Sequence, residues 1–183
     1  MGRKNSMVNK FSRIVLAFVA TAVSSALLAA PAEFEYEFDE PAAWKEAAKA
    51  LPNYPRDEDL LPVDIQMTNA DFEFFIDGKT IMLGEDNVIT YTTVINSDSG
   101  AKNVLREGMR CGFDEYKVYA YGASDASFYI NKTPEWQSVP RNGTNAYRKE
   151  LANYMCGTNL LPLKPKQILD RIRYPQHIPN LSD

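Results

Sequence analysis

The sequence contains few of the residues on which enzymes and metal sites usually depend. It has one histidine, His177, and two cysteines, Cys111 and Cys156. A single histidine argues against an ordinary zinc site, and the absence of C-x-x-C argues against a thioredoxin-like redox site or haem attachment. The chain also lacks G-x-S-x-G, H-E-x-x-H, P-loop and dinucleotide-binding motifs. We therefore expect no metal and no cofactor, and the motifs identify no catalytic residue.

Long apolar runs are also scarce, and the one present lies near the N-terminus. Residues 1–13 carry four basic residues and no acid, and an uncharged apolar run follows over residues 14–30. A basic region, an apolar region and small residues at the exit are typical of a secretory signal peptide. We expect cleavage after Ala32, so that residues 1–32 are the signal peptide and residues 33–183 form a single periplasmic domain.

An uncleaved membrane anchor is the alternative interpretation of this run. At about 17 residues it is short for crossing a bilayer, and its serines, threonine and alanines weaken it further. No later segment is apolar enough to span a membrane. We expect a soluble product with no membrane span after signal cleavage.

The charge of the chain after cleavage limits its partners. The full sequence has 20 basic and 24 acidic side chains. Removing residues 1–32 takes away four basic residues and no acidic one, which leaves 16 against 24, a net charge of −8. Because phosphate backbones require a basic surface, we expect no nucleic-acid partner. About 151 residues remain, enough for one domain with one core.

The two cysteines predict a disulfide bond. In an oxidising compartment, two cysteines in a small domain usually pair. A free reactive thiol is the alternative, but a catalytic cysteine needs a base nearby, and the single histidine lies near the C-terminus. We expect Cys111 to pair with Cys156 and to stabilise the fold by about 3–4 kcal/mol.

Apolar patterning and turn residues predict a short helix, a series of strands, and then two helices. The expected helices cover Pro41 to Leu51, Asn145 to Cys156 with Thr144 as cap, and Pro165 to Arg173. The expected strands are Phe72 to Ile76, Thr80 to Leu83 returning antiparallel after an Asp77-Gly78 turn, Val88 to Ile95, Val104 to Cys111, Tyr116 to Tyr121, and Ser127 to Ile130. This order favours an α+β fold in which an antiparallel sheet meander packs against a few short helices.

Strand periodicity suggests a binding surface on this sheet. If Cys111 faces the helix, Arg106 and Arg110 lie on the opposite face. A hairpin pairing Cys111 with Tyr116 would place Arg110 opposite Lys117. It would also put Tyr119 and Tyr121 on that face, with Tyr91 and Trp136 as further members. Such a cationic, tyrosine-rich patch could bind a small anion or a partner's carboxylate. The alternative is that these cations pair with acids of the protein itself.

Glu107 can be interpreted in two ways. The same periodicity places it on the helix-facing side of its strand, with Leu105 and Met109. It could be a perturbed acid or base in a pocket. The interpretation that we favour is pairing with an arginine, such as Arg148 on the following helix.

The central segment, residues 89–122, resembles the cryptic neisserial protein-like family. The resemblance rests on Y-T-x-V at Tyr91 to Val94, Asn103-Val104, E-G-x-R-C at Glu107 to Cys111, K-x-Y-A-x-G at Lys117 to Gly122, Trp136, and N-x-x-R-x-x-L-x-x-Y-x-C at Asn145 to Cys156. It extends over residues 34 to 175. These are exported proteins of Gram-negative bacteria without an established activity, so the resemblance implies a periplasmic location and no catalytic residues.

Together these features predict a non-enzymatic binding or interaction module in the periplasm. Its expected partner is an envelope protein or a small anionic ligand. The expected binding residues are Arg106, Glu107, Arg110, Lys117, Tyr119 and Tyr121. The alternatives are a carboxylate-dependent hydrolase using Glu107, or a structural protein of the cell envelope.

Overall fold

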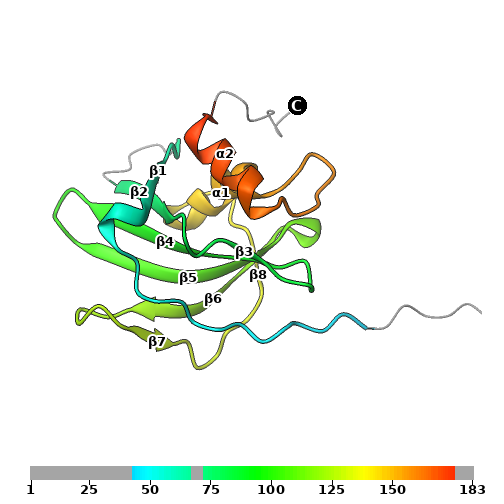
Figure 1. The fold of residues 1–183 in the computed structure, drawn as a ribbon, viewed down its shortest axis with the longest axis horizontal. Coiled ribbons are helices and arrows are strands. Elements are labelled where there is room, and N and C mark those ends of the chain that lie inside the picture. The colour runs from blue at the N-terminus through cyan, green and yellow to red at the C-terminus, as the bar shows by residue number, and fades with distance from the viewer. Residues whose placement is uncertain (1–42, 67–71, 176–183) are drawn as a thin grey trace, which may run out of the picture. The chain divides into compact units, whose positions relative to one another are not determined.

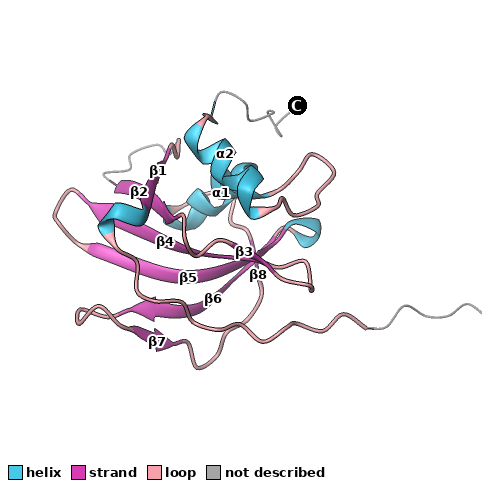
Figure 2. Ribbon diagram, in the orientation of Figure 1, coloured by secondary structure: helices cyan, strands magenta, loops and turns pink. Residues whose placement is uncertain are grey.

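A computed structural model describes residues 43–66 and 72–175 of the protein. The signal peptide and cleavage site expected within residues 1–32 lie outside these residues. The described part forms one eight-stranded antiparallel sheet with two short α-helices (Figures 1 and 2). The α+β fold expected from the sequence is therefore confirmed.

Six of the eight strands follow one another in the order β1-β2-β4-β5-β6-β7, while β3 pairs with β4 and β8 with β6. The strands are β1 Leu60–Val63, β2 Phe72–Asp77, β3 Met82–Leu83, β4 Ile89–Ser97, β5 Lys102–Arg110, β6 Glu115–Gly122, β7 Phe128–Ile130 and β8 Gln137–Ser138. The central strand β4 starts with six buried residues, all β-branched or aromatic, which suits a strand covered on both faces.

The sequence expectation for the second strand of the first hairpin was wrong. Asp77 does begin a turn, since the Thr80 N–H donates to the Asp77 carbonyl at 3.2 Å. The chain then does not return along β2. Met82 and Leu83 instead pair with Thr90 and Ile89 of β4, because β4 is longer than β2 and offers free backbone groups beyond its end.

The two helices follow the last strand. Helix α1 is Tyr147–Met155, and α2 is Pro165–Arg173 as expected. Thr144 does not cap α1. It begins a 3₁₀ turn, Thr144–Ala146, that runs directly into the helix without a side-chain cap. This turn carries the chain from the sheet onto the helix without a break.

The expected disulfide is present, with Cys111 and Cys156 bonded across a sequence separation of 45 residues. It joins the end of β5 to the residue after α1. The main core lies between these elements and includes Ile76, Met109, Leu151 and Ile168. The bond therefore fixes the helix end to the sheet at the edge of the core.

The register of the β5–β6 hairpin differs from the expectation. Met109, not Cys111, lies opposite Tyr116, so Arg110 faces Glu115. Residues Cys111–Phe113 form a 3₁₀ turn, and Asp114 closes it in the left-handed conformation at φ 52°. The shift of two residues replaces a repulsive arginine–lysine pair by an attractive arginine–glutamate pair, which explains why this register is preferred.

A bulge in β6 then changes the face of Tyr121. Glu107 pairs with Val118, but Arg106 pairs with Ala120, so Tyr119 is an extra residue. An extra residue reverses the inward–outward alternation beyond it. Tyr121 consequently lies opposite Leu105, on the helix-facing side of the sheet. It does not share a face with Arg110 and Lys117 as the sequence analysis expected.

Residues 43–55 cross the other side of the sheet without secondary structure, and we call this segment the strap. Figure 1 shows it in cyan, running past β6 toward β1. A helix from Pro41 to Leu51 was expected, and the described part of that range is not helical. The Ala47 N–H donates to the Asp86 carboxylate at 2.8 Å instead of to a helical carbonyl. Such tertiary bonds outweigh the weak intrinsic stability of a short helix.

Candidate functional site

Glu107 and Arg148 form a buried ion pair on the helix-facing side of the sheet. The Arg148 Nη2–Glu107 Oε1 distance is 2.6 Å, and the two side chains are 4% and 0% exposed. Thr93 and Tyr147 also donate hydroxyl hydrogen bonds to the Glu107 carboxylate. The pairing favoured by the sequence analysis is thus present. Together with the two hydroxyl bonds, it leaves the Glu107 carboxylate hydrogen-bonded on several sides.

The electrostatics of the pair keep Arg148 charged. Burial alone would lower the pKa of Arg148, but the charge of Glu107, its hydrogen bond and the nearby Tyr147 and Tyr91 together more than offset this, so the pKa lies above its ordinary value. The guanidinium also lies against two rings, 4.1 Å from the centroid of Tyr116 and 4.5 Å from that of Tyr147. Arg148 is therefore a fixed cation whose faces are covered by aromatic rings.

A pocket of about 430 Å³ opens beside this arginine. Its apolar wall comes from four strands and includes Phe72, Phe74, Ile95, Leu105, Val118 and Tyr121. Its polar wall comes from the segment after β7 through α1, together with β5, and includes Asn103, Asn131, Glu135, Gln137, Thr144 and Asn145. Both the volume and the mixture of an apolar wall with a few polar groups are typical of small-molecule sites.

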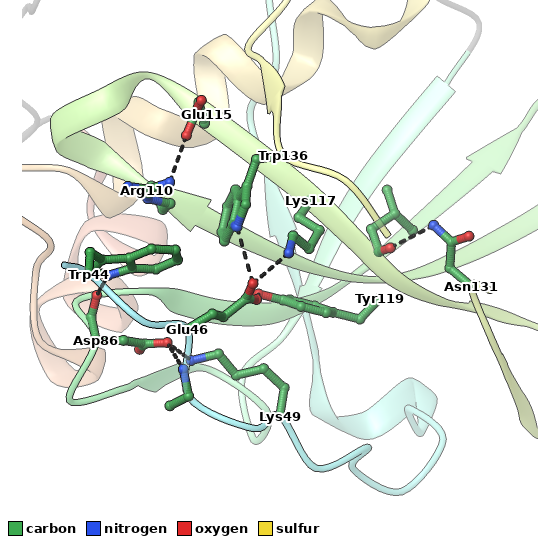
Figure 3. A network of polar contacts seen from close by, with 12 residues as sticks. Trp44, Glu46, Lys49, Asp86, Arg110, Glu115, Lys117, Tyr119, Asn131 and Trp136 are labelled. Carbon is green, nitrogen blue, oxygen red and sulfur yellow. Dashed lines mark hydrogen bonds and ion pairs between the residues drawn. The ribbon is translucent and has the colours of Figure 1, made fainter. Parts of the chain in front are cut away.

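The opposite face holds a cluster of polar contacts that fastens the strap (Figure 3). The Glu46 carboxylate accepts hydrogen bonds from Lys117 Nζ at 2.5 Å, Tyr119 Oη at 2.6 Å and Trp136 Nε1 at 3.2 Å. Partial burial would raise the pKa of Glu46, but the bonds from Lys117 and Tyr119 outweigh it and lower the pKa. The strap thus supplies the acid that neutralises Lys117.

Tyr119 reaches Glu46 by lying flat over Gly108 of the neighbouring strand. A Cβ atom built on Gly108 would approach the Tyr119 ring within 2.7 Å. Any larger residue at this position would push the ring away. Gly108 is therefore needed for close approach of the ring and not for an unusual backbone angle.

Arg110 lies at the same face, held between aromatic rings. Its guanidinium carbon is 4.0 Å from the ring centroids of both Trp44 and Phe113. It also forms an ion pair with Glu115 at 3.0 Å. The cation is thus already matched by a neighbouring acid and by cation–π contacts.

Arg106 is on the same face but is only 2% exposed. It donates from Nη1 to the Thr80 carbonyl at 2.9 Å and from Nη2 to Thr90 Oγ1 at 2.7 Å. Burial lowers its pKa to about 10. Since the guanidinium is enclosed and Arg106, unlike Arg148, does not line the pocket, Arg106 does not contribute to the expected binding surface.

The expected binding residues therefore divide between two sides of the sheet. Arg110, Lys117 and Tyr119 come together on the strap side, joined by Trp136, which the sequence analysis named as a further member. Tyr121 lines the pocket on the other side, and Glu107 lies buried beneath its arginine. Tyr91, the other further member, is fully buried in the core.

Several residues of these sites were missed by sequence reasoning. Trp44 and Glu46 fell within the helix expected from Pro41 to Leu51, and no signal marked Asp86 as an anchor. The amides of the pocket, such as Gln137 and Asn145, lie in segments with no motif. Their only common feature is the concentration of asparagine and glutamine between residues 131 and 145.

Two further features of the described residues are negative. They contain no cluster of histidine, cysteine, aspartate or glutamate able to hold a metal ion. None of the helices in residues 43–66 and 72–175 is both long enough and apolar enough to cross a membrane.

The sequence matches the model of one protein family. The match covers residues 39–173, and the family is described as the CNP1-like family. No curated protein and no solved structure matches the chain. The matched range includes the strap with its polar contacts and the residues that line the pocket.

Proposed function

The chain belongs to the CNP1-like family, and we propose that it is a non-enzymatic binding module that holds a small molecule in the pocket beside Arg148. The observation that carries this proposal is the pocket itself. It has about 430 Å³ of space, an apolar wall, and a buried arginine at its polar wall. A fold that needed only a stable core would gain more from filling this space with side chains.

The state of Glu107 supports binding over hydrolysis. A carboxylate acting as acid or base must reach the substrate. Glu107 is fully buried and already accepts bonds from Thr93, Tyr147 and Arg148. Its role is to hold Arg148 in position, which is a structural contribution to a binding site.

The strap side of the sheet is less suited to be the ligand site. Its cations Arg110 and Lys117 are paired with Glu115 and Glu46, and both are mostly buried. A new anion would have to displace an acid of the protein itself. The alternative raised for this patch, pairing with the protein's own acids, therefore agrees with the contacts.

We also propose that the protein is exported to a bacterial periplasm after cleavage behind Ala32. The basic and apolar regions of residues 1–30 support export, and a disulfide between Cys111 and Cys156 suits an oxidising compartment. Cell fractionation with intact-mass measurement tests this: a periplasmic product beginning at Glu33 is expected. A cytoplasmic product that keeps residues 1–32 would refute it.

Fragment binding tests the pocket. Methyl and amide NMR spectra of the folded protein would be recorded with a set of amphipathic fragments. Shifts should concentrate at Leu105, Val118 and Asn145. A Leu105→Trp variant, which fills the pocket, should abolish them, whereas Leu83→Phe, a partly buried control away from the pocket, should not. Fragments that shift other surfaces alone would refute the proposal.

A further inference from the structure

Much of the polar wall of the pocket presents hydrogen-bond donors, and Glu135, which is exposed, is the one acid among its lining residues. Asn145 shows this most directly, because its Oδ1 accepts from Arg148 Nη1 at 2.9 Å. Arginine can only donate, so the amide oxygen must face Arg148. The group of Asn145 that remains for a ligand is its NH2.

Gln137 of strand β8 shows the same arrangement. Its Oε1 accepts the hydroxyl hydrogen of Tyr116 at 2.7 Å. The amide oxygen is again used within the protein, and the NH2 group remains. Two amides from separate segments of the chain therefore offer the same kind of group to the pocket that they line.

Arg148 adds further donors. Of the five N–H groups of a guanidinium, the one on Nε and one on Nη2 serve Glu107, and one on Nη1 serves Asn145. One N–H on each of Nη1 and Nη2 remains. Because the rings of Tyr116 and Tyr147 lie against the guanidinium, these N–H groups extend from the edge of an arginine that lines the pocket.

The charge balance restricts the ligand further. Glu107 neutralises Arg148, so the wall does not require a doubly charged anion such as phosphate. Glu135 adds a negative charge to the lining, but it is exposed and its charge is screened by solvent. At the donor groups themselves, an oxygen acceptor that is neutral or singly negative is favoured and a cation is opposed. The apolar wall opposite, with Phe74, Leu105 and Val118, suits a hydrocarbon or aryl body.

We infer that the pocket binds small amphipathic molecules whose polar end is a carboxylate or a carboxamide, held by the free N–H groups of Gln137, Asn145 and Arg148. This rests on the proposed binding function and adds the chemistry of the ligand. The apolar body lies on the sheet, and the acceptor oxygens meet the donor wall.

Three fragments with one body and different heads test the inference: 3-phenylpropionate, 3-phenylpropanamide and 3-phenylpropylamine. Titration of the full mature protein, followed by NMR at Leu105 and Val118, should show binding of the first two. The amine should bind roughly tenfold more weakly, because it offers no acceptor. Comparison of the acid and the amide separates a carboxylate ligand from a neutral one.

Asn145→Asp sharpens the test. Aspartate keeps an oxygen for Arg148 but replaces the NH2 donors by a second acceptor. The variant should weaken binding of the acid and the amide roughly tenfold, and strengthen binding of the amine. Asn142→Asp is the matched control, since Asn142 is exposed and does not line the pocket.

The outcomes separate this inference from the proposed function. Equal binding of the three fragments in the pocket, or no effect of Asn145→Asp beyond that of Asn142→Asp, would overturn the donor-wall inference and leave the binding module intact. Absence of pocket shifts with all three fragments would count against both.

Discussion

Glu107 of β5 and Arg148 of α1 are joined inside the domain, with the carboxylate fully buried and the nitrogen–oxygen distance at 2.6 Å. The pair links the middle of the sheet to the first turns of the helix. It also sets the orientation of the arginine at the pocket wall.

Glu107→Gln is expected to lower the free energy of unfolding by about 3–5 kcal/mol, because it leaves the buried Arg148 charge without its partner. Chemical denaturation measures this. The double variant Glu107→Gln with Arg148→Gln should cost less than the two single changes added together, since no charge is then left alone. A loss below about 1 kcal/mol for Glu107→Gln would contradict a strongly coupled pair.

Tyr91 and Tyr147 make a matched pair for hydrogen bonding in the core. The Tyr91 hydroxyl is buried and has no partner among the described residues, whereas the Tyr147 hydroxyl donates to Glu107. Tyr147→Phe should cost about 1–2 kcal/mol, and Tyr91→Phe should be neutral or slightly stabilising. Thermal or chemical unfolding of both variants compares the two losses of stability. A larger loss for Tyr91→Phe than for Tyr147→Phe would contradict the prediction.

Reduction of the disulfide should lower the stability by about 3–4 kcal/mol, because the unfolded chain regains the freedom of a 45-residue separation. Denaturation midpoints with and without reductant measure this. The variant with Cys111→Ala and Cys156→Ala is the control and should not respond to reductant. An equal response of both proteins would show that reductant acts elsewhere.

The strap should loosen in acid. The pKa of Glu46 and that of Asp86 both lie below their ordinary values of 4.5 and 3.8. Burial would raise both, but the bonds from Lys117 and Tyr119 to Glu46, and from Lys49 and two backbone N–H groups to Asp86, together outweigh it. A lowered pKa in the folded state gives stability that is present above the ordinary value and is lost as the pH falls through the lowered one. Hydrogen exchange of residues 43–55 should therefore rise below about pH 4 relative to that of the sheet.

Glu46→Gln provides the matching mutation. It should raise exchange in the strap at neutral pH and reduce its dependence on acid, because the carboxylate that pairs with Lys117 is gone. Glu85→Gln, at an exposed acid near the other anchor, is the control. Equal behaviour of the two variants would show that Glu46 does not hold the strap.

The sequence predicted features that depend on local pattern. The β-branched run of β4, the helix that begins at Pro165 and the Cys111–Cys156 pairing are examples. In each, a run of residue types or the simple count of cysteines restricts the structure strongly. The pairing of Glu107 with Arg148 was anticipated in part, because periodicity placed Glu107 on the helix-facing side and Arg148 was named as a possible partner on that helix.

Features that depend on register or on distant partners were not predictable. A single extra residue, Tyr119, moved Tyr121 to the other face, and nothing in the local sequence marks that bulge. The strap has helical composition, yet Trp44, Glu46 and Lys49 each bond to residues far along the chain. The pocket escaped prediction because its two walls come from separate parts of the sequence.

The position of the strap also bears on where a tag or a surface linker can be joined to the domain. The strap lies on the sheet side of Lys117 and Tyr119, and the pocket opens on the side of Tyr116 and Val118. A purification tag or a surface linker joined before the strap would therefore leave the mouth of the pocket clear. Immobilisation through the N-terminal side is the orientation to choose when small molecules are screened against this protein.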